Sequence, residues 1–308
     1  MAENKRSFRQ EHPVLLGLAI LAGVFVCTWL GMTFFLPLLP GVGSHNIFQA
    51  RAGKVGVVEL KGMITSPEKA LQELTQFRDD RSIKAIVLRI DSPGGAVGAS
   101  QEIFEEVKRT SQAKPVVASM GSVAASGGYY AALGANEIMA SKGTLTGSIG
   151  VIIKFANLSQ IFEKIGYKSE VLKSGELKDI GASDRQMTAR EKKLIQDIID
   201  NVHEQFISAV SESRELATEE VRKLADGRIY SGEQALEAGL IDKFGNFNDA
   251  IMLAASLAGL KKEMPPLVYP AKEDFSLLRL LVGDSGSTLF EGKSNLRPLL
   301  SYEWSLAQ

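Results

Sequence analysis

PVVASMGSVAASGGYYAA, residues 115–132, carries the clearest signal for the fold of this 308-residue chain. Residues 115–120 form a short apolar run typical of a buried strand, and the small residues after it lead to a glycine turn at Ser126, where a helix is expected to start. A serine at such a junction is either a nucleophile held by a tight turn or only a small residue that fits the turn. The rest of the sequence must decide between these two interpretations.

The same order of strand, turn and helix continues on both sides of this stretch. Helix 68–77 is expected to begin at Pro67 with Ser66 as its cap. We predict strands at 55–60, 84–90, 115–120, 137–141, 148–154 and 168–172, and helices at 68–77, 97–111, 157–166, 188–215, 218–225, 232–238 and 247–258. Short apolar strands that alternate with helices predict an α/β fold with a parallel sheet buried on both faces.

Composition excludes several classes of function. The hydrophobic content of 45% supports a sizeable core, and the 35 basic and 36 acidic residues leave no broad positive field for nucleic acid. The single cysteine, Cys27, has no partner for a disulfide. The three histidines, His12, His45 and His203, lack the close spacing of metal ligands. We therefore predict no metal and no cofactor.

An uncharged apolar run, residues 14–36, precedes the predicted fold. As a helix rising about 1.5 Å per residue it would cross a bilayer core of about 30 Å, whereas the alternative is a buried core helix. The sequence after the run offers no small-x-small cleavage site, so we predict a retained anchor and not a cleaved signal peptide.

Charge on the two sides of the run predicts its orientation. Lys5, Arg6 and Arg9 precede it, and the next basic residue is Arg51, which places the N-terminus in the cytoplasm. The predicted division is a cytoplasmic N-terminus (1–13), a transmembrane helix (14–37), a linker (38–52), a folded domain (53–260) and a weakly structured C-terminal tail (261–308). The folded domain would lie outside the cytoplasm.

Two glycine turns, SPGG (92–95) and ASGG (125–128), follow two predicted parallel strands. Because the carboxyl ends of parallel strands lie at one edge of a sheet, the turns are expected to face the same space. The backbone N–H groups of Gly94 or Gly95 and of Gly127 would then form an oxyanion hole beside Ser126.

A nucleophilic serine needs a base, and the histidines are poorly placed for that role. His12 is predicted to be cytoplasmic, His45 lies in the linker and His203 lies on a charged helix. A neutral lysine can also act as a base. Lys178 lies in a glycine- and serine-bearing loop, KSGELKDIGASDRQMT (173–188), and Lys173 in the same loop is the alternative.

Five sequence blocks contain the glycine turns, Ser126 and the lysine-bearing loop. IDSPGG (90–95), ASGGYY (125–130), GTLTGSIGV (143–151), KSGELKDIG (173–181) and DGRIYSGEQALEAGLIDKFG (226–245) together resemble the signal peptide peptidase A family in its short, membrane-anchored bacterial form. The resemblance covers residues 53–260, which would then be the peptidase domain. It implies a Clp protease/crotonase-like fold and a serine peptidase with a serine–lysine dyad.

The resemblance also implies roles for individual residues and partners. Ser126 would be the nucleophile, Lys178 the general base and Ser148 the residue that orients the lysine, with Gly95 and Gly127 as oxyanion donors. The choice of Gly95 over Gly94 rests on the family pattern. The family further implies a homo-oligomer at the lipid bilayer of the bacterial cytoplasmic membrane, whose substrates are remnant signal peptides.

Other functions remain open at this point. The crotonase fold also holds acyl-coenzyme A enzymes, and an inactive membrane scaffold could retain the fold. A related membrane protease that cuts a membrane-protein partner is a third alternative. Tyr129 and Tyr130 are expected to pack in the core, and Asp91 and Asp179 are interpreted as turn or surface acids.

Overall fold

The computed structural model describes residues 21–31, 53–261, 263–270 and 301–303, the last three as backbone only. The chain forms two compact units, Met1–Ala52 and Gly53–Gln308. In the first unit, residues 21–31 are helical. The rest of the predicted span 14–37, the N-terminus 1–13 and the whole linker 38–52 lie outside the described residues. Over the parts of the chain that the structure describes, no helix combines the length and apolar character needed to cross a membrane.

The second unit is built on one mostly parallel sheet. Within its described residues, the strand order is β7 (Ile229–Ser231), β6 (Leu145–Gly147), β4 (Val116–Ala125), β2 (Ile83–Ser92), β1 (Lys54–Lys61) and β9 (Leu267–Val268), with β5 (Glu137–Ala140) beside β4 and β8 (Lys243–Phe244) beside β5. The β6–β7 pair is antiparallel, and the other strand pairs of this sheet are parallel. The predicted α/β fold with a parallel sheet is confirmed.

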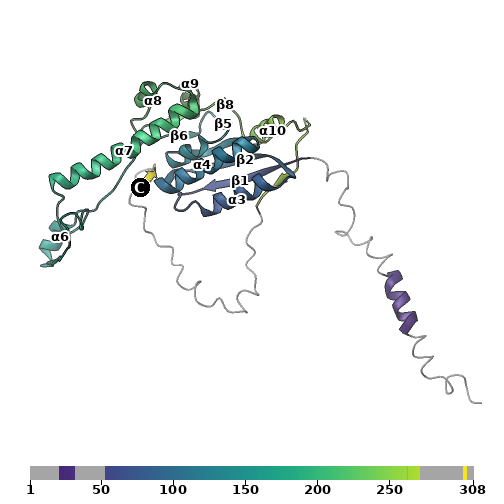
Figure 1. Ribbon diagram of the computed structural model, residues 1–308, viewed down its shortest axis with the longest axis horizontal. Helices are drawn as coiled ribbons and strands as arrows, with labels where there is room; N and C mark the ends of the chain where they lie inside the picture. The colour runs from purple at the N-terminus through teal and green to yellow at the C-terminus, as the bar shows by residue number, and fades with distance from the viewer. Residues whose placement is uncertain (1–20, 32–52, 262, 271–300, 304–308) are drawn as a thin grey trace, which may run out of the picture. The chain divides into compact units, whose positions relative to one another are not determined.

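Helices cover both faces of this sheet, as Figure 1 shows. Strand side chains alternate between two apolar clusters: Ile86 and Leu88 of β2 join one cluster, and Ala85 and Val87 join the other. The first cluster includes residues of α3 (Glu68–Asp79), α4 (Val97–Ala113), α5 (Gly127–Ala132) and α7 (Ala189–Arg214), and the second is closed by α10 (Phe247–Leu257). Tyr129 and Tyr130 lie in the first cluster, as predicted.

Three local predictions are wrong. Ser66 does not cap α3: the N-cap is Pro67, and the Ser66 hydroxyl donates instead to the Glu68 carboxylate. The strand predicted at 148–154 is absent because β6 ends at Gly147 and Ser148 turns the chain with a φ of 52°. The segment 168–172 is not a strand: all its side chains are exposed, so it has no sheet against which to pair.

A short antiparallel ribbon joins the glycine turn to the end of the chain. β10 (Ser301–Glu303) pairs with β3 (Gly94–Ala96), with Tyr302 opposite Gly95. On its other side Gly95 forms a parallel bridge with Ile64. Parts of the predicted tail therefore pair with the domain, since β9 also lies beside β1. Residues 271–300 and 304–308 lie outside the described residues.

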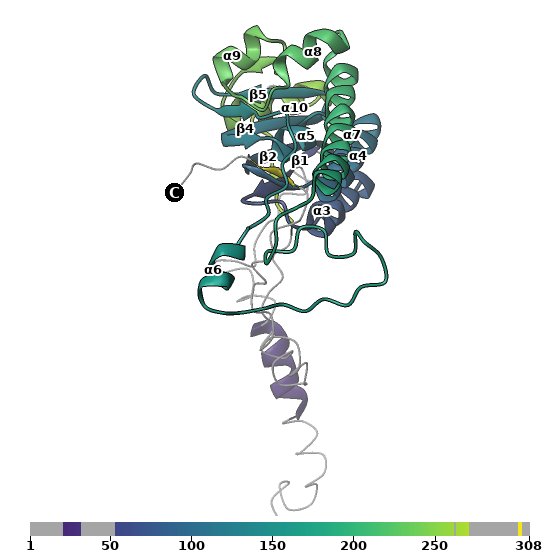
Figure 2. The same ribbon diagram turned by 90° about the vertical axis from the view of Figure 1, so that its left-hand side faces the viewer.

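Residues 151–188, here called the excursion, lead away from the sheet after β6 and end at the start of α7, whose later turns return to the core (Figures 1 and 2). The excursion holds α6 (Ser159–Lys164). The buried apolar residues of α7 all lie between Phe206 and Val210, so its first turns accompany the excursion and not the core. The large exposed apolar side chains of the excursion are Leu158, Ile161, Ile165, Tyr167, Val171 and Leu172. The small helices α8 (Thr218–Leu224) and α9 (Gly232–Glu237) follow α7.

Candidate active site

Ser126 lies at the sharp junction between β4 and α5. Its φ of 53° and ψ of −117° are rare for a residue with a side chain, and such conformations cluster at functional sites. The backbone fixes this turn from both sides: the Ser126 N–H donates to the Gly147 carbonyl at 2.7 Å, and its carbonyl accepts from the Tyr130 N–H at 2.8 Å. The side chain is 1% exposed, and its Oγ has no hydrogen-bond partner among the described residues.

The two glycine turns meet beside this serine, as predicted. A Cβ atom on Gly127 would lie 2.4 Å from Ser100 Oγ and 3.2 Å from the Gly95 nitrogen, and one on Gly95 would lie 2.0 Å from the Ile64 carbonyl oxygen. Only glycine allows the backbones to approach this closely. The Gly94 N–H donates to Ser92 Oγ at 3.1 Å, whereas Gly95 pairs with Tyr302 of β10 on one side and with Ile64 on the other.

The backbone also places Ser148 next to Ser126. It follows Gly147, whose carbonyl accepts the Ser126 N–H, and its own N–H donates to the Arg228 carbonyl at 2.8 Å. Its φ is 52°, and it is buried. The structure therefore groups Ser126, Ser148, Gly95 and Gly127, which are four of the five residues that the sequence proposed for the site.

Lys178 is the residue that the single chain does not bring to the serine. Its side chain is exposed in the excursion, and the unpaired Ser126 Oγ shows that no described residue binds it. The Nε2 atom of His203 likewise lacks a hydrogen-bond partner among the described residues, so this histidine does not bind the serine either. Lys173, the alternative base, donates to the Asp179 carboxylate at 2.6 Å.

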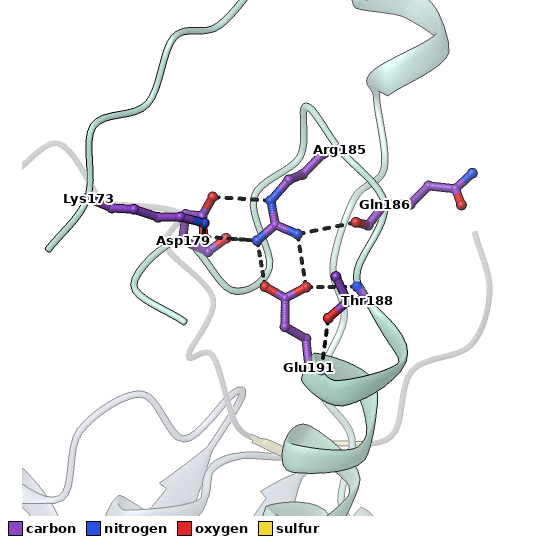
Figure 3. Close-up of polar contacts among 6 residues, drawn as sticks. All are labelled: Lys173, Asp179, Arg185, Gln186, Thr188 and Glu191. Carbon is purple, nitrogen blue, oxygen red and sulfur yellow. Dashed lines mark hydrogen bonds and ion pairs between the residues drawn. The ribbon is translucent and has the colours of Figure 1, made fainter. Parts of the chain in front are cut away.

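The lysine-bearing loop has an ion-pair network of its own, drawn in Figure 3. Arg185 binds the carboxylates of both Asp179 and Glu191. Its guanidinium, helped by the Thr188 N–H, lowers the pKa of Glu191 to about 2. Arg185 and then Lys173 also hold the pKa of Asp179 well below its usual range. The Asp91 carboxylate, in contrast, accepts a hydrogen bond from the Val123 N–H at 3.1 Å.

Sequence reasoning did not single out Arg185 and Glu191. The signal that could have indicated Glu191 is the spacing T-x-x-E at 188–191, which the structure resolves as a capping box at the start of α7. Arg185 had no such local signal, because its partners are separated from it by six residues on each side.

The parallel sheet, the serine junction and the adjoining glycine backbones define an α/β protein with a Clp protease-like fold. Residues 51–145 match the Clp protease family, and residues 108–261 match Peptidase family S49. The chain belongs to peptidase family S49, in the group of signal peptide peptidase A, and is a serine peptidase. This membership decides in favour of a peptidase over an acyl-coenzyme A enzyme.

Several relatives are similar over much of this chain. A Synechocystis sequence named as a protease is 43% identical over 75% of this chain and 84% of its own length. An Enterococcus faecium sequence named as signal peptide peptidase SppA is 39% identical over 63% of this chain, and Protease 4 of Salmonella typhi is 37% identical over 68%. The chain spans 55% and 35% of these two relatives.

Two solved structures are also similar. A ClpP1 mutant from Listeria monocytogenes covers 63% of this chain and 93% of its own, with 18% identity and a TM-score of 0.44. A mutant of the 1510-N membrane-bound stomatin-specific protease covers 72% of this chain and 99% of its own, with 18% identity and a TM-score of 0.49.

Proposed function

We propose that this chain is a membrane-anchored serine endopeptidase that degrades remnant signal peptides and other apolar peptides outside the bacterial cytoplasmic membrane. The observation that carries the proposal is the conformation of Ser126, whose buried Oγ is unpaired beside two glycine backbones. The uncharged run 14–36 supports the anchor, and the name of the Enterococcus relative supports the substrate class.

In the proposed mechanism, Ser126 and Lys178 act as a dyad. Neutral Lys178 accepts the proton of the Ser126 hydroxyl as Oγ attacks the peptide carbonyl carbon, and the N–H groups of Gly95 and Gly127 hold the oxyanion. The C–N bond then breaks, and the lysine ammonium returns the proton to the leaving amine. Water releases the acyl group by the same steps, and Ser148 orients the lysine.

The dyad requires Lys178 to contact Ser126, but the two side chains are not hydrogen-bonded to each other within one chain. We propose that the chain forms a homo-oligomer in which the excursion of one copy delivers its lysine to the Ser126 of a neighbour. The exposed apolar side chains of the excursion support this arrangement, because contact with a second copy would remove them from water. They would contribute to the association as apolar interface surface does in general.

Peptide substrates are supported by the ribbon beside the serine. β3 already accepts one extended segment as an antiparallel strand, namely β10. An extended substrate can pair with the same strand edge through its main chain, a mode of binding that tolerates many side chains. Its scissile carbonyl would then lie near Ser126.

The test uses the full chain in detergent micelles with an unstructured protein and an apolar fluorogenic peptide as substrates. Ser126→Ala and Lys178→Ala are each expected to lower kcat/KM by about 1,000-fold or more, because a nucleophile and its base act as a unit. Lys173→Ala removes the alternative base together with one contact on Asp179, and should lower kcat/KM far less than Lys178→Ala. Activity retained by Lys178→Ala but lost in Lys173→Ala would overturn the assignment of the base, and a wild-type chain without cleavage would favour the scaffold.

Mixing two inactive variants tests the proposed sharing of sites. If each site uses one serine and one lysine from two copies, random co-assembly of Ser126→Ala with Lys178→Ala should restore activity at about a quarter of the sites. If both residues come from one chain, the mixture should stay inactive.

The membrane topology is tested in cells. Alkaline extraction should leave the chain in the membrane fraction, and protease added to spheroplasts should digest residues 53–308 while leaving an N-terminal tag intact. Release by alkali, or protection of the catalytic domain, would overturn the proposed anchor or its orientation.

A further inference from the structure

We propose that Arg185 is a positioning residue for the lysine base, and that it holds the Lys178 loop against the start of α7. This inference rests on the proposed function, in which Lys178 is the base. Arg185 itself would touch neither the substrate nor Ser126. It would act through Asp179, the residue directly after Lys178.

The guanidinium binds both sides of the loop at once. Towards Asp179, Nε donates to Oδ2 at 3.1 Å and Nη2 donates to Oδ1 at 2.9 Å and to the backbone carbonyl at 3.2 Å. Towards Glu191, Nη2 and Nη1 donate to the two carboxylate oxygens at 2.5 and 2.9 Å. The two carboxylates thus receive two-pronged contacts that the planar guanidinium can make and an ammonium cannot.

The network is largely shielded from solvent, although it lies in an excursion rich in exposed residues. The Glu191 side chain is 3% exposed and that of Asp179 is 15% exposed. Lys173 adds a third cation contact on Asp179, and Nη1 of Arg185 also donates to the Gln186 carbonyl at 3.2 Å. Figure 3 shows the guanidinium between the two carboxylates, with Lys173 on the far side of Asp179.

Glu191 links this cluster to a rigid element. Its carboxylate accepts the Thr188 N–H at 2.8 Å, and its own N–H donates to Thr188 Oγ1 at 3.2 Å, which closes the capping box of α7. At its other end α7 is buried in the core at Phe206 and Val210. The Lys178 loop is therefore connected through Arg185, Glu191 and α7 to the sheet that carries Ser126.

The second arginine of this region has the contacts of a surface residue. Arg190 pairs with Glu176 at 2.7 Å, and both side chains are about two-thirds exposed. It also joins the lysine loop to α7, but through a single solvated contact, which contributes little. Arg190→Ala is thus a matched control that removes an arginine–carboxylate link between the same two segments.

The experiment compares Arg185→Ala, Arg185→Lys and Arg190→Ala in the full chain. Arg185→Ala is expected to lower kcat by about 10- to 100-fold with KM within about twofold, because displacement of a base by about 1 Å has an effect of this size. Arg185→Lys should recover part of kcat, and Arg190→Ala should match wild type. The rate at which Ser126 reacts with a fluorophosphonate should fall in the same order.

Parallel variants separate failure of this proposal from failure of the proposed function. If Lys178→Ala remains active, the base is misassigned and Arg185 has no base to position. If Lys178→Ala is inactive while Arg185→Ala keeps the kcat of Arg190→Ala, the positioning role alone is overturned. Should Arg185→Ala fail to fold or assemble, Asp179→Asn decides, since it leaves the α7 cap intact: a lowered kcat at unchanged KM supports the proposal, and an unchanged kcat overturns it.

Discussion

Ser126 and Ser148 both hold left-handed backbone conformations, with φ of 53° and 52°. Each such residue costs about 1–3 kcal/mol and persists only when its surroundings fix it. Here the two are coupled, because the Ser126 N–H bonds to the residue just before Ser148. The strain lies at the proposed nucleophile and at the serine next to its hydrogen-bond partner, and not in the sheet strands.

Replacing Ser126 in two ways should reveal this strain. Ser126→Gly is expected to be more stable to urea than Ser126→Ala by about 1 kcal/mol, since glycine adopts a positive φ without steric cost. Both variants should be inactive. Equal unfolding midpoints and slopes for the two variants would mean that the turn relaxes without its serine and stores no strain.

Gly127 offers a test of the predicted oxyanion hole. Gly127→Ala should lower kcat by at least about 10-fold, because its methyl group would press on Ser100 Oγ and on the Gly95 nitrogen. Adding Ser100→Ala, which removes the nearer contact, should restore part of the loss. Gly98→Ala on the same helix as Ser100 is the control, since its Cβ would meet nothing within 4 Å. A fully active Gly127→Ala would exclude the close approach as a requirement.

Among the elements, strands β1, β2, β4 and β5 were predictable because each is a short, mostly apolar run, whereas the two- and three-residue strands β6 to β9 were not predicted. Consecutive residues of these strands are buried without a break, at 55–58, 85–88 and 116–118. This is the pattern of a parallel sheet that is covered on both faces. The serine and glycine turns were predictable for the same reason, since they follow two of these strands. The strand predicted at 148–154 failed because Ser148 turns the chain just after β6, and the one predicted at 168–172 failed because its side chains are exposed in the excursion.

The parts that could not be predicted depend on contacts between distant segments. The β3–β10 ribbon joins residues about 200 positions apart through three-residue strands, which have no periodicity to detect. The position of Lys178 depends on an excursion that buries little of its apolar surface within one chain. The role assigned to Arg185 depends on carboxylates that meet only in three dimensions.

The start of α7 should respond to acid. Arg185 lowers the pKa of Glu191 from 4.5 to about 2, so the carboxylate stabilises the folded loop above about pH 4.5 and loses this effect as the pH falls towards 2. The rate of pepsin cleavage within residues 173–191 of the wild-type chain should therefore increase as the pH falls through this interval. The Glu191→Gln variant should be cleaved rapidly at every pH of the interval. Parallel pH profiles for the two proteins would show that Glu191 does not hold the loop.

For the whole molecule, a lysine base predicts the pH dependence of catalysis. Activity should increase towards alkaline pH, because the base accepts a proton only in its neutral form. The measurement is kcat/KM across pH in the assembled protein, with the oligomeric state checked at each pH. A flat profile from acid to alkaline pH would contradict a lysine base.

The end of the chain also influences the whole molecule through β10. Residues 301–303 occupy the edge of β3 that a substrate is proposed to use. Deleting residues 271–308 should therefore lower KM for a long unstructured substrate and leave kcat of the chemical step unchanged. An unchanged KM would mean that substrates bind without displacing this strand.

A strand supplied by the same chain acts as a tethered competitor, whose effective concentration does not fall when the protein is diluted. Any peptide that reaches β3 must exchange its main-chain bonds for those of residues 301–303. In a folded protein the backbone N–H and C=O groups are already hydrogen-bonded, so they are not free to replace the bonds of residues 301–303. Under the proposed mode of substrate binding, the ribbon would therefore favour fully extended chains over intact neighbouring proteins.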